Sequence, residues 1–236
     1  MKTLLKYSAV LACGALTLTR LCAAIESVKI EANFIPALNP ALLNRGITEG
    51  RVNLVIDVSE EGKMTDWLVL GYTDPEIATY FIQALKDWDI KPARVDGKPV
   101  AAQIELVATV SAEGVVLSRT ATEMFEDYFR RIRGNPIKHQ RSSVHELDRL
   151  PVALNTVSPK YAQDAVKQGV RGKVLVHFYI DERGAVRMPS VLPGAHPYLA
   201  DEAVTALREW KFEPPTRKGR PVLVAASQEF DFSGEK

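Results

Sequence analysis

Four histidines are the residues of this chain best suited to acid–base or metal chemistry. They are His139, His145, His177 and His196, and no two of them have the short HxH or HxxxH spacing of paired metal ligands. We expect His177 to lie exposed or half-packed in a strand, because its apolar neighbours fall on the opposite face. We expect His196 to cap a helix. The histidines therefore predict neither a catalytic centre nor a metal site.

The carboxylates give the same result. They lie at predicted strand ends and hairpin turns, where Asp and Glu are common for conformational reasons, namely at Asp57, Glu60, Glu61, Asp181 and Glu182. The chain has no nucleophile elbow, no phosphate-binding loop and no dinucleotide-binding glycine pattern. A paired-carboxylate hydrolase remains a minor alternative. The sequence favours a protein that is not an enzyme and that uses no cofactor and no metal.

The N-terminus has the pattern of an export signal. Lys2 and Lys6 precede a mostly apolar run at Tyr7–Leu18, and small residues lead up to Ala24. The run is short for a membrane span, which needs about 20 apolar residues. We therefore predict a signal peptide at 1–24 and a periplasmic mature protein. The alternative is an uncleaved anchor in the inner membrane.

Composition narrows the class further. Both cysteines, Cys13 and Cys22, fall within the predicted signal peptide, so the mature chain would have no disulfide and no thiol catalyst. Hydrophobic residues make up 46% of the chain and charged residues 25%, as in ordinary globular proteins. The formal net charge of +1 gives no reason to expect a nucleic-acid partner.

The elements that carry these residues occur twice. Leu85–Val100 and Leu207–Val222 share the same order of helix end, tryptophan, proline, glycine turn and strand, at a constant offset of 122. Between 50–100 and 172–222, 15 of 51 ungapped positions are identical, whereas about 3 would be expected from composition alone. We interpret the chain as an internal repeat.

Each copy predicts the same sequence of elements. In the first copy these are a short strand, a short helix, a hairpin, a main helix and a last strand, at Ile25–Phe34, Pro36–Asn44, Gly50–Val58 with Lys63–Gly71, 75–88 and Val100–Val110. In the second copy the short helix, hairpin, main helix and last strand are Ser158–Gln168, Gly172–Asp181 with Ala185–Leu192, Pro197–Trp210 and Val222–Phe232. Alternating apolar residues mark the strands, and a 3.6-residue apolar period marks the main helices. The predicted fold is α+β, with two tandem modules that each have a three-stranded antiparallel sheet and a helix on one face.

The predicted boundaries follow from this repeat. Residues 25–114 form the first copy, 115–149 a helix with a basic linker, and 150–236 the second copy. In the linker, Thr120–Glu123 has the spacing of a capping box before an apolar helix stripe. We expect Trp88, Trp210, Phe178 and Phe212 to be structural core residues, in preference to a ligand platform at the tryptophans.

The second copy resembles a known family. The segments Tyr161–Ala165, Gly172–Gly184, Leu207–Pro214 and Gly219–Val222 together resemble the C-terminal domain of TonB, the periplasmic energy transducer. The resemblance extends from about Leu150 to Phe232. The first copy is a degenerate version, with Asn39 opposite Tyr161 and Asp57 opposite Tyr179. The resemblance implies the fold and a non-enzymatic binding role in the cell envelope.

TonB transducers also have an anchor with a functional histidine and a long proline-rich spacer. Neither feature is found here, since the first histidine is His139. We therefore expect a periplasmic TonB-like binding or adaptor protein that recognises an envelope protein, such as an outer-membrane receptor, by strand addition. One alternative is an anchored TonB energy transducer for outer-membrane transport. Another is a structural scaffold whose two modules pair with each other, and a homodimer is also possible.

The last strand is the candidate partner-binding edge. After Pro221 it has no proline, and its middle carries a single charge, so it lacks the residues that usually protect an edge from pairing. In the resembled family this strand captures an extended receptor peptide. The candidate binding residues are every second residue of the predicted strand: Val222, Val224, Ala226, Gln228, Phe230 and Phe232.

Overall fold

The computed structural model describes residues 25–31, 38, 40–111, 114–118, 139–160, 169–191 and 194–233. The predicted signal peptide, the capping-box helix and most of the predicted helix at Ser158–Gln168 lie outside these residues. Among the described residues, no helix is both long enough and apolar enough to span a bilayer.

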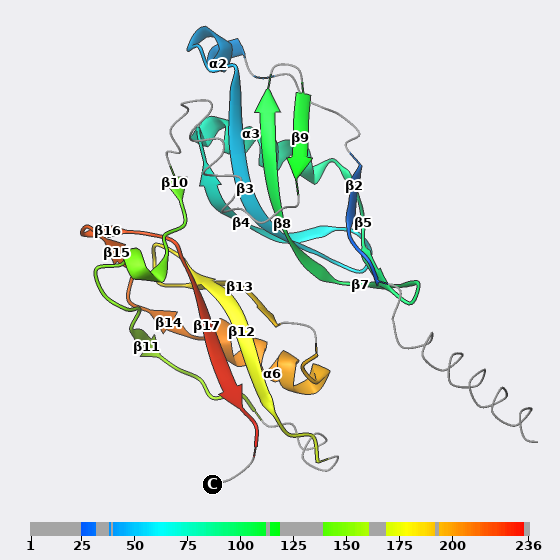
Figure 1. Cartoon of the computed structure of the whole chain (residues 1–236), viewed down its shortest axis with the longest axis vertical. Coiled ribbons are helices and arrows are strands. Elements are labelled where there is room, and N and C mark those ends of the chain that lie inside the picture. The colour runs from blue at the N-terminus through cyan, green and yellow to red at the C-terminus, as the bar shows by residue number, and fades with distance from the viewer. Residues whose placement is uncertain are drawn as a thin grey trace, which may run out of the picture.

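A five-stranded antiparallel sheet dominates the N-terminal half (Figure 1). Its order is β10-β4-β3-β8-β9. The strands are β3 (Glu49–Val58), β4 (Met64–Tyr72), β8 (Ala102–Ser111), β9 (Gly114–Ser118) and β10 (His139–Gln140). Helix α3 (Pro75–Lys86) covers one face. Alternate residues of β3, including Val52, Leu54 and Ile56, are fully buried against it together with Phe81 and Trp88.

The prediction of three strands was wrong for this half. Strand β9 turns back on β8, with Val110 opposite Val115, and β10 adds to the outer edge of β4, with His139 opposite Tyr72. Both extra strands come from the region adjoining or within the predicted linker. They form because an edge strand leaves a row of unpaired backbone groups that a nearby segment can satisfy.

The C-terminal half has the smaller sheet that the sequence predicts. Its order is β13-β12-β17, with β12 (Lys173–Ile180) in the centre, β13 (Val186–Val191) on one side and β17 (Val224–Asp231) on the other. Helix α6 (Pro197–Arg208) packs on one face. The core beneath it is a second apolar cluster, which includes Val176, Ile180, Leu207 and Phe230.

Short elements connect these two cores. Helix α2 (Pro40–Asn44) precedes β3, and η1 (Val144–Glu146) is a single 3₁₀ turn. The remaining strands pair in small antiparallel ladders: β1 (Ile25–Glu26) with β6 (Ala93–Val95) and β7 (Lys98–Val100), β2 (Lys29–Glu31) with β5 (Asp89–Lys91), β11 (Ala153–Asn155) with β14 (Lys211–Phe212), and β15 (Thr216–Arg217) with β16 (Arg220–Pro221).

Local signals set the ends of the main elements. Asp74 accepts a hydrogen bond from the backbone N–H of Glu76 at 2.9 Å, and Pro75 opens α3, as predicted. His196 stands at the same place before α6, but its side chain makes no capping hydrogen bond there. Its ring lies 5.5 Å from that of Tyr198 instead. The capping role expected of His196 is therefore not what the structure shows.

In each half, one glycine lets the tip of the hairpin approach the segment that follows the main helix. Gly62 and Gly184 both have positive φ, 77° and 79°. A Cβ atom at Gly184 would lie 1.9 Å from the carbonyl oxygen of Phe212, and one at Gly62 would lie 2.0 Å from that of Ile90. Only glycine permits this approach. The hairpin tip is thereby held against the segment that follows the main helix.

The two halves touch through the sheet faces that lie opposite their helices. Val55 and Leu70 of the N-terminal sheet pack with Met188 and Leu223 of the C-terminal half in a third apolar cluster. Polar contacts flank this cluster. Arg187 donates to the carbonyl oxygen of Trp67 at 3.1 Å and lies 3.2 Å from the carboxylate of Asp66. Gln103 donates to the carbonyl oxygen of Met188 at 3.3 Å.

Asp57 lies beside this contact between the halves. Its partial burial raises the pKa of its carboxyl group, and the nearby charge of Asp66 raises it further, while a hydrogen bond from Gln103 at 2.9 Å opposes the shift. The charged form is therefore less stable here than in water.

We predict that Gly184→Ala destabilises the protein by about 1–3 kcal/mol more than Gly219→Ala. Both sites have positive φ, so both variants carry the same backbone strain. A Cβ at Gly219 meets nothing within 4 Å, whereas one at Gly184 meets the carbonyl of Phe212. Urea denaturation of the two variants measures the difference. Equal losses would show that the close approach does not constrain the fold.

We predict that Asp57→Asn increases the free energy of unfolding at pH 7. A raised folded-state pKa means that the protonated form is favoured in the folded state. The stabilising contribution of the protonated carboxyl group is fully present below the pKa of the unfolded state, near 3.8. It is lost as pH rises through the pKa of the folded state. The amide of the variant is neutral at every pH and still offers an oxygen to Gln103. The difference in free energy of unfolding between the variant and the parent should therefore shrink as pH falls towards 3.8. Denaturation at several pH values tests this, and a constant difference would contradict it.

Candidate functional site

The outer edge of β17 has a fixed pattern of backbone groups. The pairing with β12 is unbroken from Val224 opposite Ile180 to Asp231 opposite Lys173. The N–H of Phe232 donates to the carbonyl oxygen of Gly172 at 2.8 Å. Since hydrogen-bonded pairs alternate along antiparallel strands, the even-numbered residues of β17 direct their backbone groups towards β12.

The odd-numbered residues therefore direct their backbone groups outward. The carbonyl oxygen of Glu229 accepts from the side-chain amide of Gln228 at 2.7 Å. In the described part of the chain, the N–H and carbonyl of Ser227 and the N–H of Glu229 have no hydrogen-bond partner. This stretch is an edge at which a further strand can pair.

The chain itself occupies the head of this edge. The N–H of Ser142 donates to the carbonyl oxygen of Leu223 at 2.8 Å, and Ser142 forms a parallel bridge with Val224. One residue earlier, the N–H of Arg141 donates to the carbonyl oxygen of Leu70 at 2.7 Å. The segment from β10 to Ser142 thus joins an edge of the N-terminal sheet to the head of β17.

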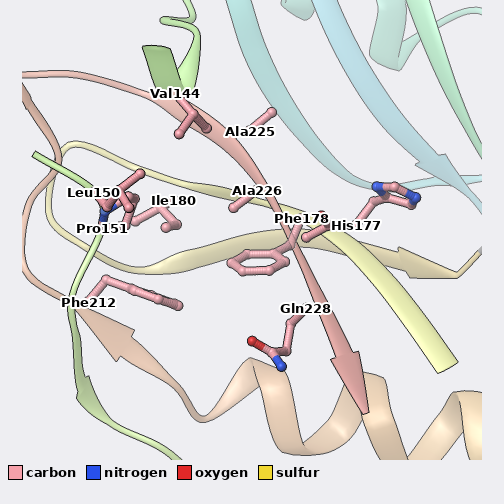
Figure 2. A pocket seen from close by; sticks show the side chains of 11 residues that line it. Val144, Leu150, Pro151, His177, Phe178, Ile180, Phe212, Ala225, Ala226 and Gln228 are labelled. Carbon is pink, nitrogen blue, oxygen red and sulfur yellow. The ribbon is translucent and has the colours of Figure 1, made fainter. Parts of the chain in front are cut away.

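An apolar groove lies beside the edge. Its volume is about 560 Å³. Its apolar lining comes from five segments of the chain: Val144, then Leu150 and Pro151, then Phe178 and Ile180, then Phe212, then Ala225 and Ala226 of β17. Figure 2 shows the rings of Phe178 and Phe212 on the same side of the strands, and their centroids are 5.8 Å apart. The remaining described lining residues are His177, Ser227 and Gln228, so no carboxylate, lysine or arginine of the described chain lines the groove.

The wall of the groove is an extended segment held by hydrogen bonds. The N–H of Glu213 donates to the carbonyl oxygen of Val152 at 2.8 Å, and the side chain of Asn155 accepts from the N–H of Lys211 at 2.6 Å. The carboxylate of Asp148 accepts from the N–H groups of Gly219 and Lys218, which lowers the pKa of Asp148. This wall exposes apolar side chains, since Leu150 is 70% exposed.

The strand residues named from the sequence lie mostly on the core side. Of the six, Val224, Phe230 and Phe232 are buried, and Val222, Ala226 and Gln228 are partly buried. Val222 and Phe232 fall just outside β17. Their side chains support the strand, while the outward backbone groups belong to the residues between them. Partner binding by this strand stays a prediction.

The four predicted core aromatics are placed differently from one another. Trp88, Phe178 and Phe212 are buried. Trp210 is partly buried and lies 5.7 Å from the ring of Phe230, and its indole N–H donates to the carbonyl oxygen of Val157 at 2.8 Å. Trp210 therefore also connects the segment before β12 to the end of α6.

Sequence reasoning missed the groove wall and the bridge at Ser142. One available signal was the alternation of Leu150, Val152 and Leu154, three apolar residues in an extended segment. Another was the predicted repeat, in which Ala226 stands at the position that Ile104 has 122 residues earlier. The bridge had no sequence signal, since backbone groups make it.

The predicted repeat places β8, 122 positions earlier in the chain, at the position of β17. Strand β9 pairs with β8 from Val107 to Ser111, which corresponds to 229–233. In the described residues, no group of three or more His, Cys, Asp or Glu side chains could hold a metal ion. Strand β17 thus offers a sheet edge beside an apolar groove, and that arrangement can bind an extended chain.

Comparisons with known proteins point to the same part of the chain. Residues 157–233 match the family model of the Gram-negative bacterial TonB protein C-terminal. The chain is similar to the TonB CTD of Pseudomonas aeruginosa, known from a solution NMR structure, with 30% identity and a TM-score of 0.34. That similarity covers 41% of this chain and 96% of the other. None of the curated proteins matches.

We predict an alternating pattern of amide hydrogen exchange along β17. The N–H groups of Ser227 and Glu229 should exchange fast, and those of Gln228 and Phe230 should be protected by β12. The central strand β12 is the control, because it is paired on both sides and its residues His177 and Tyr179 should both be slow. Exchange followed by NMR measures this. Protection at Ser227 and Glu229 would show that the edge is already covered.

Proposed function

We propose that this protein is a TonB-like binding protein of the bacterial envelope, and that it captures an extended segment of an envelope protein by strand addition to β17. The observation that carries the proposal is the outward row of backbone groups at Ser227 and Glu229 beside an apolar groove. Backbone hydrogen bonds give such a complex its affinity, and side-chain pockets give it selectivity.

The family match supports this assignment of the edge. It spans 157–233 and so includes β12, α6 and β17. In the family that the sequence resembles, the last strand takes up a peptide from an outer-membrane receptor. The proposed location is the periplasm, with 1–24 acting as an export signal. The proposed action is binding.

We also propose that the N-terminal half is a degenerate copy of the same module. Helices α3 and α6 begin and end 122 residues apart, and so do the glycines that meet Ile90 and Phe212. Each copy has a hairpin, a helix, a small ladder and a last strand in the same order. In the first copy β9 pairs with β8 from Val107 to Ser111, whereas no strand among the described residues pairs with the corresponding end of β17 on its outer side.

A scaffold is the second candidate. The apolar contact of Val55 and Leu70 with Met188 and Leu223 favours it, because the two halves use their sheet faces to bind each other. In this case the protein would position the two halves and take no partner strand. The two candidates differ in whether Ser227 must offer its backbone N–H.

The test is Ser227→Pro, with Ser227→Ala as the matched control. Proline removes one outward donor and leaves the inward pairing of β17 in place, since it is tolerated on an edge strand. Alanine keeps the donor. We expect Ser227→Pro to weaken partner binding by about tenfold or more, the equivalent of one net hydrogen bond.

Affinity capture from a detergent-treated envelope fraction, followed by measured dissociation constants for each captured protein, reports the result. Circular dichroism and thermal melting check that both variants are folded. If folded Ser227→Pro keeps every partner of the parent with unchanged affinity, strand addition at β17 is wrong and the scaffold is favoured.

A further inference from the structure

We infer that the groove beside β17 is a pocket for one bulky, uncharged apolar side chain of the partner segment, and that Ala226 is the specificity-determining residue that opens it. This inference rests on the proposed strand addition and specifies the chemistry of the strand that is added. The partner is a segment of another protein in extended conformation, with a branched aliphatic or aromatic side chain at the position facing Ala226.

The shape of the groove supports this size of side chain. Its floor is formed by Phe178, Ile180 and Phe212, all buried, and its wall by Leu150 and Pro151. Ala226 lies between the edge and the floor (Figure 2). Its single methyl group leaves the floor accessible from the edge. In a β-ladder, side chains directly opposite one another share a face, so a partner residue opposite Ala226 points into this space.

The charge of the lining sets the polarity of the side chain. Among the described residues, no Asp, Glu, Lys or Arg lines the groove, and His177 is the only titratable residue of that part of the lining. Figure 2 shows His177 directed away from the aromatic floor, on the other side of β12. A charged side chain placed on this floor would lose its hydration without gaining a partner. The pocket therefore discriminates against charged side chains.

The N-terminal copy shows what fills the corresponding space when no partner is needed. Ile104 lies 122 positions before Ala226 and packs against the core. Leu106 lies before Gln228 and is fully buried. Apolar side chains thus fill these two positions in the first copy, whereas the small side chain of Ala226 leaves the floor of the groove accessible in the second.

The pocket is continuous with a contact that the chain already makes. Ser142 pairs with the head of β17, and the side chain of Val144 lines the groove two residues later. An apolar side chain that follows a strand paired to this edge therefore already lies at the head of the pocket. A partner strand paired at Ser227 would extend the same arrangement along the edge.

The probe is a peptide of residues 113–119 of this chain, Glu-Gly-Val-Val-Leu-Ser-Arg with blocked ends, because β9 pairs with the corresponding edge of the first copy. A second peptide replaces all three central apolar residues by Ser. Both are titrated against the full chain without its first 24 residues, and the amide shifts of Ser227 and Glu229 are followed by NMR.

The protein variants separate the pocket from the edge. Ala226→Ile copies Ile104 and fills the pocket while keeping every backbone donor. Leu150→Asp charges the exposed wall without touching the core, and Val152→Asp is its control on the same segment outside the groove. We expect the first two to weaken binding of the apolar peptide at least about tenfold, and the control to change it less than about twofold. The Ser-substituted peptide should bind at least about tenfold more weakly than the parent peptide.

The outcomes distinguish this inference from the function on which it rests. If Ser227→Pro abolishes binding while Ala226→Ile and Leu150→Asp do not weaken it, strand addition holds and the pocket is wrong. If Ser227→Pro binds as the parent does, the proposed function fails. If the parent shows no shift at millimolar peptide, or dimerises through β17 in sedimentation experiments, the pocket does not serve an external apolar segment and the inference is overturned.

Discussion

The approach of Gly184 to the carbonyl of Phe212 is the constraint on which the C-terminal half depends. With no side chain at Gly184, the N–H of Phe212 can donate to the Gly184 carbonyl oxygen at 2.8 Å. This bond fixes the chain leaving α6 against the tip of the β12–β13 hairpin. It also sets the ring of Phe212 beside Phe178, which creates the floor of the groove. A backbone contact thus determines the position of a binding surface formed by side chains.

Edges explain most of the remaining architecture. Each sheet leaves unpaired backbone groups at its outer strands, and the chain satisfies them in different ways in its two halves. In the N-terminal sheet, β9 pairs with Val107–Ser111 of β8, and β10 pairs with the end of β4. In the C-terminal sheet Ser142 covers only the head of β17, so the stretch around Ser227 keeps its outward groups. The asymmetry lies in how the edges are closed, since the cores beneath them are built alike.

Sequence patterns predicted the elements whose causes are local. Asp74 and Pro75 mark the start of α3, Gly62 and Gly184 mark the hairpin turns, and strict alternation marks β3 and β12. These signals lie within a few residues of the structure they specify. Strands β9 and β10 could not be predicted in this way. Neither has the alternating apolar pattern of a half-buried strand, and both form by pairing with the backbone groups of an edge strand.

The candidate site shows the same division. Strand β17 could be chosen from the sequence, because the absence of proline and of a run of charges is visible in the sequence alone. The residues within it could not be chosen in this way, because the outward pattern depends on which residues pair with β12. The hydrogen bond from the N–H of Phe232 to the carbonyl oxygen of Gly172 sets that pattern. The backbone groups of even-numbered residues face β12, and those of Ser227 and Glu229 face outward.

The exposed wall of the groove leaves apolar surface that a partner can cover. An apolar side chain gains free energy on burial, at roughly 25 cal/mol for each Å² removed from water. Leu150 is 70% exposed and does not obtain this burial within the described chain. Ala226 has a similar consequence, because its small side chain leaves the floor without the additional methyl groups that Ile104 has at the position 122 residues earlier. Both residues lie beside the stretch of β17 whose backbone faces outward, so a single added strand can cover the apolar surface and the outward hydrogen-bonding groups.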